Sequence, residues 1–403
     1  MIFEYFQIVF ASLKHRKLRS WLTILGITIG ITAIVALMSL SQGMEDAFRG
    51  IFSGVGSDRI MISPGNAQNP AFTAITVSNL GEEDLEVVKN TKGVYHAIGV
   101  MEKTFTVKYR GEPKTIRVVA VPTDKKSTEM IEEVDFYAVE EGRPFEESDK
   151  YKAIAGIKIA TDTFEKDVKV GDDLEILGHK FEVVGISQES GNPLAERFVR
   201  IPLETFKDLT GEEHFFSIFA KTEKGADPNV VVDEIKENLR KERGLKEGEE
   251  DFSVKTSNEV IEGAFTILGQ IRVFVITIAA VSLVVGGFGV MNTMFTAVTE
   301  RTKEIGIMKS VGARNFDILA IFTIESGLIG LIGGAIGLLF GYGTAKGVEV
   351  IALNYGLKSL KATISLDLVL LSFGISFLLG IVFGLVPAIR AAKLKPVEAI
   401  RHG

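Results

Sequence analysis

The chain has 403 residues, of which 46% are hydrophobic and 24% charged, and its formal net charge is −7. Its mean hydropathy of +0.25 excludes an average soluble enzyme, and the lack of cysteine excludes a disulfide framework and a thiolate metal site. Residues 45–265 hold 29 Lys and Arg against 44 Asp and Glu, whereas the remainder holds 16 against 8. Such an acidic domain is unsuited to binding nucleic acid.

The first 17 residues form an amphipathic pattern, and a basic cluster follows them directly. We expect residues 1–17 to form a helix lying in the cytoplasmic membrane interface, with a frayed tail as the alternative. The apolar stripe of this helix consists of Ile2, Phe6, Val9, Phe10 and Leu13.

Four long stretches are free or almost free of charge. About 20 helical residues cross a hydrocarbon core of about 30 Å, so each stretch predicts a transmembrane helix. The first is too long for the apolar part of a cleaved signal peptide, about 7 to 15 residues, and we expect it to continue to residue 52 as a helical stalk. The four predicted spans are residues 18–44, 270–299, 316–345 and 368–390.

Basic residues cluster before the first span, between the second and third, and after the fourth. Because cytoplasmic loops retain Lys and Arg, these flanks predict that both termini, including the tail 391–403, lie in the cytoplasm of a cell-membrane protein. The insert 45–265 and the short loop 346–367 are then extracytoplasmic.

The insert alternates short β-branched runs, turn signals and polar helical segments, which predicts an α+β domain of two subdomains. Candidate helices at residues 81–90 and 227–241 each lie next to strand-like runs, which predicts two α/β halves formed from the beginning and the end of the insert. Residues 139–203 are predicted to form a second, mostly β subdomain.

Small residues recur four apart in three spans, a spacing that lets helix backbones approach closely in lipid. Since glycine is also simply commoner in membrane helices, any single pair carries little weight. The predicted packing residues are Gly26, Gly30, Gly333, Gly337, Gly341, Gly380 and Gly384.

No phosphate-binding loop, nucleophile elbow or zinc-protease motif occurs in the sequence, which favours a non-catalytic chain that does not hydrolyse nucleotide itself. The five histidines lie far apart without ligand spacing, so no metal site is expected. Glu325 lies about two turns inside the third predicted span, whereas the other charged residues of the spans lie at their ends, so it requires a polar partner. We expect a Ser, Thr or Arg of a neighbouring helix, and a proton relay is the alternative.

The segment 300–314 between the second and third spans predicts a short amphipathic helix. Ile305, Met308 and Val311 recur every three residues among charged side chains, and Gly312 can end the helix. A short helix of this kind suits a groove on a protein partner, although a membrane-surface loop without a partner fits the pattern as well.

Three motifs in this order resemble those of FtsX-like, MacB-type ABC transporter permeases. They are LRSWLTILGITIGI at residues 18–31, NTMFTAVTERTKEIGIMKSVGAR at 292–314 and PAIRAAKLKPVEAIRH at 387–402. The insert agrees, because EGRPF, VGDDLEIL and FEVVGI resemble the core domain of that family.

The resemblance implies a homodimer or pseudo-dimer in membrane lipid, paired with two copies of a separate cytosolic ATPase that binds ATP and magnesium. The permease itself would bind no cofactor, and Glu325 matches a glutamate usual at the start of the third span. The ATPase-coupling contact would consist of Glu300, Arg301, Glu304, Ile305, Met308, Lys309 and Gly312.

The function implied is mechanotransmission, in which ATP-driven movement of the cytosolic subunits moves the outer domain. The expected task is export or extraction of a lipoprotein, peptide, lipid or amphipathic drug, with an extracytoplasmic adaptor as a further option. The alternative is a regulatory member that controls an extracytoplasmic protein such as a cell-wall hydrolase.

Overall fold

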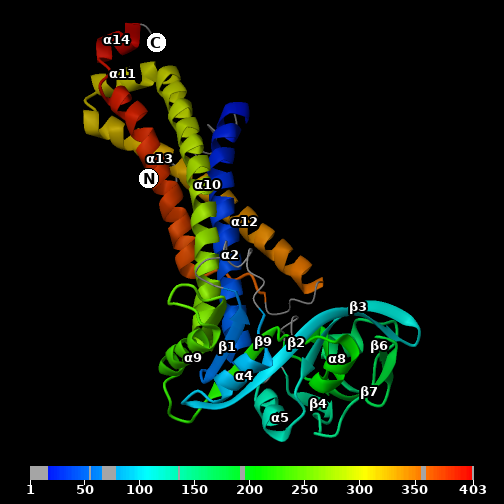
Figure 1. The fold of residues 1–403 in the computed structure, drawn as a ribbon. Coiled ribbons are helices and arrows are strands. Elements are labelled where there is room, and N and C mark those ends of the chain that lie inside the picture. The colour runs from blue at the N-terminus through cyan, green and yellow to red at the C-terminus, as the bar shows by residue number, and fades with distance from the viewer. Residues whose placement is uncertain are drawn as a thin grey trace. The chain divides into compact units, whose positions relative to one another are not determined.

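The computed structural model describes residues 17–53, 56–65, 79–134, 137–190, 196–354 and 360–401 (Figure 1). Two units can be distinguished: a helical unit (residues 1–45, 266–355 and 360–403) and an α/β unit (residues 46–265 and 356–359). Nearly all of the predicted interfacial helix at residues 1–17 lies outside the described residues.

Four helices of the described chain are long and apolar enough to cross a membrane, in agreement with the sequence prediction. They are α2 (Lys17–Ser53), α10 (Ser257–Glu300), α12 (Asn315–Asn354) and α13 (Leu366–Ala392). Two short helices, α11 (Thr302–Ser310) and α14 (Pro396–Arg401), follow α10 and α13 and pack together.

Three of the long helices extend beyond the apolar stretches visible in the sequence. Helix α2 continues to Ser53, as expected for the stalk, and α10 begins at Ser257, well before its apolar stretch. Helix α12 continues to Asn354, so the first part of the predicted loop 346–367 is helical. Residues 346–354 contain no proline, and Gly347 is their one glycine. Nothing in that segment therefore ends the helix at the apolar boundary.

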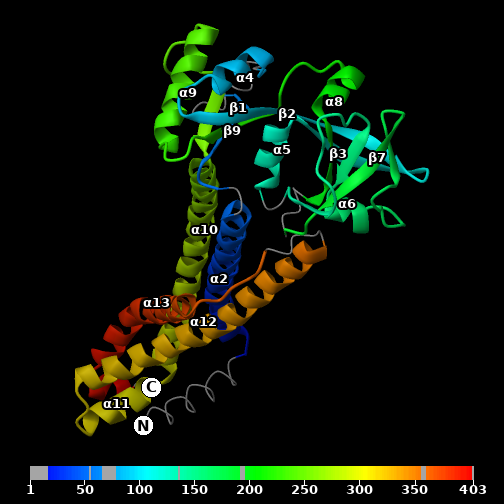
Figure 2. The ribbon, with the colours of Figure 1, turned by 90° about the horizontal axis from the view of Figure 1, so that it is seen from below.

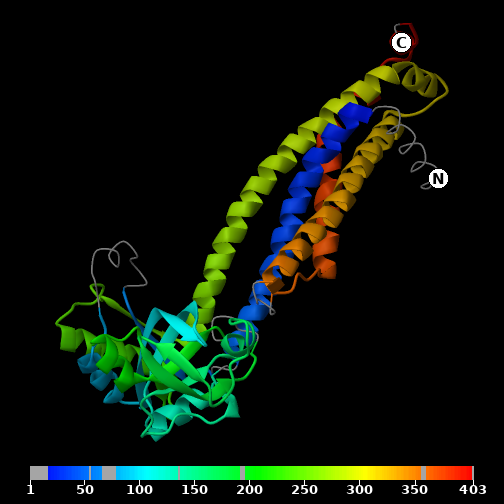
Figure 3. The same ribbon diagram turned by 90° about the vertical axis from the view of Figure 1, so that its right-hand side faces the viewer.

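Helix α2 lies beside both α10 and α12, and glycines permit this approach (Figure 3). A Cβ atom added at Gly26 would lie 2.6 Å from Cα of Gly286 on α10. One added at Gly337 would lie 2.7 Å from Cβ of Ile31 on α2. The other predicted glycines of these helices have similarly close neighbours: Leu283 beside Gly30, Ile27 beside Gly333 and Val35 beside Gly341.

Helices α12 and α13 approach through small residues on both sides. A Cβ atom at Gly380 would lie 2.3 Å from the carbonyl oxygen of Ser326, and one at Gly330 would lie 2.1 Å from that of Ser376. A Cβ atom at Gly384 would lie 2.0 Å from Oγ of Ser326. Gly286 and Gly330 were not predicted as packing residues, because neither belongs to the predicted sets of glycines.

The α/β unit contains a sheet of ten described strands in the order β10-β1-β9-β2-β3-β8-β5-β7-β4, with β6 paired to both β2 and β7. The strands are β1 (Arg59–Pro64), β2 (Val94–Tyr109), β3 (Glu112–Val121), β4 (Val139–Gly142), β5 (Lys152–Ala155), β6 (Asp173–Ile176), β7 (His179–Ser187), β8 (Phe198–Pro202), β9 (Ser217–Thr222) and β10 (Phe252–Thr256). The helices are α4 (Glu82–Lys89), α5 (Lys125–Glu132), α6 (Ile157–Thr161), α8 (Leu203–Thr210) and α9 (Pro228–Arg243).

One end of the sheet joins the beginning and the end of the insert, because β1 lies between β9 and β10. Strands β10, β1 and β9 carry α4 and α9 side by side on one face (Figure 2). Asp227 caps the first turn of α9 by accepting from the amide of Asn229, and Gly244 ends the helix at φ +64°. Arg243 bonds Asp84 of α4 at 2.7 Å and Asp251 at 2.8 Å, which joins both helices to the approach to β10.

The other part is a closed ring of strands rather than a separate sheet. Strands β2, β3, β8, β5, β7 and β6 pair in sequence, and β6 returns to β2 at Val107 and Lys108. The tight β2–β3 turn uses positive φ angles at Arg110 and Gly111. The predicted β subdomain 139–203 is therefore incomplete, because its ring also needs β3 and half of β2.

We predict that Gly380→Ala lowers the stability of the protein in detergent by about 1–3 kcal/mol, since the methyl group would meet the Ser326 carbonyl. Gly374 lies on the same helix with no neighbouring atom within 4 Å of an added Cβ, so Gly374→Ala is the matched control. Thermal unfolding checks both variants, and equal midpoints would contradict the close α12–α13 packing.

Candidate functional site

The candidate site is the turn, helix and turn that connect α10 to α12. Helix α10 ends at Glu300, Arg301 forms the N-cap of α11, and α11 ends at Ser310. Gly312 then adopts φ +110°, and the amide of Ala313 donates to the carbonyl of Met308 at 3.0 Å. The left-handed conformation of Gly312 gives the reason why the chain turns here.

Arg301 binds Glu325, the carboxylate that the sequence placed inside an apolar span. The guanidinium Nη1 lies 3.1 Å from Oε2 and 3.4 Å from Oε1 of Glu325, whose side chain is only 12% exposed. Arg301 Nε also donates to Glu304 at 3.1 Å, and its guanidinium lies 5.9 Å from the ring centre of Phe322. The partner of Glu325 therefore lies in the turn before α11, and the ion pair ties this turn to α12.

The inner face of α11 packs against the rest of the helical unit. Ile305 is completely buried, and Met308 is partly buried beside the same core. Lys309 donates from Nζ to the carbonyl oxygens of Ala392 at 2.8 Å and Leu394 at 2.7 Å, where α13 ends. Ile305 and Lys309 were both expected at a partner contact, but here they bind α11 to its own chain.

The outer face of α11 is defined by Lys303, Glu304, Ile307, Ser310 and Val311, all of which are exposed. Val311 is 84% exposed and Ile307 is 49% exposed, and charged side chains surround them. Glu300 and Gly312 are exposed as well. Ile307 was not predicted as part of the apolar stripe. The prediction followed the three-residue period of Ile305, Met308 and Val311, and the first two of these lie on the inner face.

A pocket of about 730 Å³ lies between α11 and the first turns of α12. Ile305, Met308, Phe322 and Leu328 give it an apolar lining, and Arg301 with Glu325 contributes charge. Within the described ranges no group of three or more His, Cys, Asp or Glu residues could hold a metal ion. The candidate site thus consists of an exposed, partly apolar helix face with an adjoining pocket.

Comparison with protein families matches both parts of the chain. Residues 20–238 match the MacB-like periplasmic core domain, and residues 276–396 match the FtsX-like permease C-terminal region. The first match alone covers more than half of the chain.

The chain belongs to the FtsX-like, MacB-type family of ABC transporter permeases. This permease is 36% identical over 398 residues to an uncharacterized ABC transporter permease, MJ1507, of Methanocaldococcus jannaschii, covering 97% of this chain and 96% of the relative. It is 30% identical over 413 residues to an uncharacterized ABC transporter permease of Bacillus subtilis, YknZ, covering 100% and 99% of the two chains.

A third relative is longer than this permease. The macrolide export ATP-binding/permease protein MacB of Neisseria gonorrhoeae is 31% identical over 405 residues, which cover 98% of this chain but 60% of the relative. The family assignment makes the protein a multi-pass membrane protein and implies a partner ATPase.

We predict that Arg301→Ala destabilises the permease in detergent by about 1–3 kcal/mol, because it leaves the largely buried Glu325 carboxylate without its cation. Adding Glu325→Gln to this variant should recover part of the loss. The exposed neighbour Lys303→Ala serves as the control. If thermal unfolding shows Arg301→Ala to be as stable as Lys303→Ala, the ion pair has no structural role.

Proposed function

We propose that this permease transmits movement from a separate cytosolic ATPase to its α/β unit, and that the ATPase binds the outer face of α11. The observation that supports this most directly is the two-sided character of α11. Its inner side is bonded to α12 through Arg301 and Glu325 and to the end of α13 through Lys309. Its outer side presents Ile307 and Val311 to solvent.

A helix with these properties passes a displacement on instead of absorbing it. Any force on Val311 or Ile307 reaches α12 and α13 through bonds made directly by α11 and its preceding turn. Binding in a groove of the partner would cover the exposed apolar side chains, as amphipathic helices commonly do. Nucleotide chemistry, with ATP and magnesium, belongs in this proposal to the ATPase, and the permease is non-catalytic.

The connection toward the α/β unit consists of two uninterrupted helices. Both α2 and α10 contain residues of the helical unit and of the α/β unit. Within the helical unit, Arg272 of α10 donates to Ser41 at 2.7 Å and pairs with Glu45 of α2. Together with the Gly26–Gly286 approach, these bonds favour movement of α2 and α10 as a pair.

The proposed assembly is a homodimer with two ATPase copies, with α11 and both termini in the cytoplasm and the α/β unit outside. The distribution of basic residues supports this orientation. The proposed task is export or extraction of an amphipathic substrate, such as a lipoprotein, peptide, lipid or drug. Control of an extracytoplasmic protein is the second candidate, and it requires a protein-binding surface on the α/β unit.

We predict that Ile307→Asp and Glu304→Lys each reduce co-purification with the partner ATPase and its ATP-dependent activity at least about tenfold, a loss of about 1.4 kcal/mol in binding. Ile307 is exposed, so Ile307→Asp should not change the thermal stability of the permease. Glu304→Lys also removes the 3.1 Å hydrogen bond from Arg301, so its thermal stability is measured alongside its binding. Val397→Asp on α14 is the matched control, because Val397 is 77% exposed and lies outside α11. Wild-type binding by both α11 variants would contradict the coupling contact.

The orientation can be tested directly because the chain contains no cysteine. We expect Lys361→Cys in intact cells to react with a membrane-impermeant maleimide, whereas Lys395→Cys in the tail 391–403 reacts only after permeabilisation. Both side chains are exposed in the structure, so burial does not limit either reaction. The opposite labelling pattern would invert the proposed topology.

A further inference from the structure

Strand β10 lies at one end of the sheet order and pairs only with β1 among the described strands. An edge strand has backbone donors and acceptors on its outer side, and these can pair with an additional strand. The side chains of β10 alternate between buried and half-buried, so its register on β1 is well defined.

The register identifies which backbone groups of β10 point outward. Gly65 donates to the carbonyl of Asp251 at 2.7 Å, so this is a hydrogen-bonded pair of the β1–β10 ladder. Such pairs alternate along an antiparallel ladder, and Ser253 is therefore the next residue of β10 that bonds β1. Phe252 and Val254, which lie on either side of Ser253, direct their N–H and C=O groups away from β1.

Two further contacts agree with this alternation. Pro64 has no N–H to donate. It lies opposite Phe252, where the alternation places no hydrogen bond between β1 and β10. The backbone amide of Thr256 donates to the side-chain carboxylate of Glu259 at 2.8 Å. The open part of the edge is therefore short and is centred on Phe252 and Val254.

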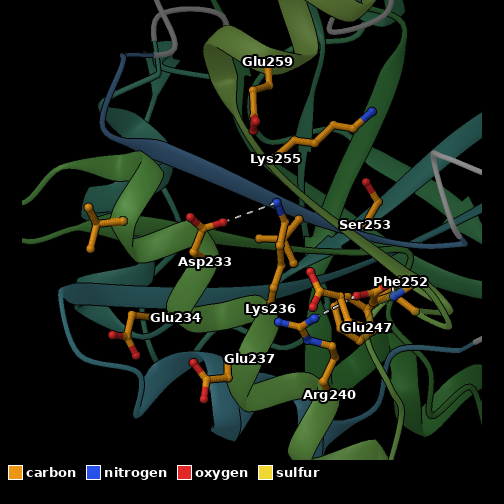
Figure 4. Close-up of a pocket in the computed structure, with 14 residues that line it drawn as sticks. Asp233, Glu234, Lys236, Glu237, Arg240, Glu247, Phe252, Ser253, Lys255 and Glu259 are labelled. Carbon is orange, nitrogen blue, oxygen red and sulfur yellow. Dashed lines mark hydrogen bonds and ion pairs between the residues drawn. The ribbon is translucent and has the colours of Figure 1, made fainter.

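A groove of about 730 Å³ runs beside this open edge (Figure 4). Helix α9 contributes Asp233, Glu234, Glu237 and Arg240 to its wall, and the turn before β10 contributes Glu247. A strand added about 4.8 Å from β10 would occupy the groove and lie against α9. The groove thus combines a backbone ladder on one side with side chains that can select a sequence on the other.

The charges of the groove favour a basic occupant. Six carboxylate side chains and three cationic ones line it. Two of the cations already face carboxylates within the groove, with Lys236 3.8 Å from Asp233 and Arg240 3.3 Å from Glu250. The excess of negative charge complements Lys or Arg side chains and disfavours acidic ones.

We propose that the open edge of β10 binds an extended, Lys- or Arg-bearing segment of another protein as an additional strand beside α9. The backbone of Phe252 and Val254 supplies the ladder, and the carboxylates of Glu234 and Glu247 select the basic side chains. The location of this partner outside the cytoplasm rests on the proposed topology. The binding itself does not depend on the ATPase contact and fails or succeeds separately from it.

The test uses the full-length permease in nanodiscs and fluorescent peptides of about seven residues. One peptide alternates Lys with Val, a second alternates Glu with Val, and a third is the Lys peptide N-methylated at alternate residues. Fluorescence anisotropy measures binding to the wild type and to the double variant Glu234→Lys/Glu247→Lys. Glu242→Lys is the matched control, since Glu242 is an exposed acid of α9 that does not line the groove.

The Lys peptide should bind the wild type and Glu242→Lys, and bind the double variant at least about tenfold more weakly. The N-methylated peptide should bind at least about tenfold more weakly to the wild type, because it cannot complete the ladder. The bound Lys peptide should also slow hydrogen exchange in Phe252–Thr256, where only the Phe252 and Val254 amides lack a partner in the ladder or at Glu259.

Three results would overturn the proposal. The first is no binding of the Lys peptide at concentrations up to about 1 mM. The second is equal binding of the Lys and Glu peptides, or binding that N-methylation does not weaken. The third is protection of Phe252–Thr256 without peptide that rises with permease concentration, because a second copy of the chain would then occupy the edge.

Discussion

The ion pair between Arg301 and Glu325 is the interaction on which this account depends. It places a charged group of an apolar helix against the turn that begins α11, and the Glu325 side chain is only 12% exposed. Burial of a charge in this environment is unfavourable unless a cation and hydrogen bonds compensate for it. The position of α11 relative to α12 is therefore restricted by electrostatics as well as by packing.

Lys309 adds a second restriction of a different kind. Its ammonium group donates to the carbonyl oxygens of Ala392 and Leu394, where α13 ends. Helix α11 and the turn before it are therefore bonded to both α12 and α13. Helices α12 and α13 in turn approach through Gly330 and Gly380, and α2 approaches through Gly337. In lipid, where apolar burial does not drive association, such close backbone contacts supply the packing energy that keeps helices together. In the proposed mechanism, a displacement of α11 is therefore shared by the helical unit.

The sequence predicted those features that depend on local pattern. Length and hydropathy were sufficient for the four long helices, and α9 was predicted as a polar helical segment next to strand-like runs. The extent of α12 was underestimated, because a helix continues past the apolar boundary unless something ends it. The short helices α5 and α8 were missed, since eight residues give too few turns for a clear period.

Features that depend on distant partners could not be predicted in the same way. The ring of strands closes through β6, whose four residues give no signal of their pairing with β2. At the candidate site the motif identified the segment but not its faces. Lys309 bonds backbone carbonyl oxygens, and every residue has one, so the sequence does not show which residues Lys309 contacts. Ile305 was predicted as an exposed apolar contact because the sequence does not show the residues that bury it. The distinction between the two faces of α11 required the structure.

The central claim is that α11 moves together with α12, and a distance measurement between the two helices tests it most directly. Spin labels on Lys303→Cys and Leu339→Cys, both exposed and in a chain without other cysteines, report this distance by pulsed electron resonance after dilution with unlabelled permease. The account predicts one narrow distance distribution that is the same in the nucleotide-free and ATP-bound complexes. A distribution that broadens or shifts when ATP binds would show that α11 moves independently of α12 and would contradict the account.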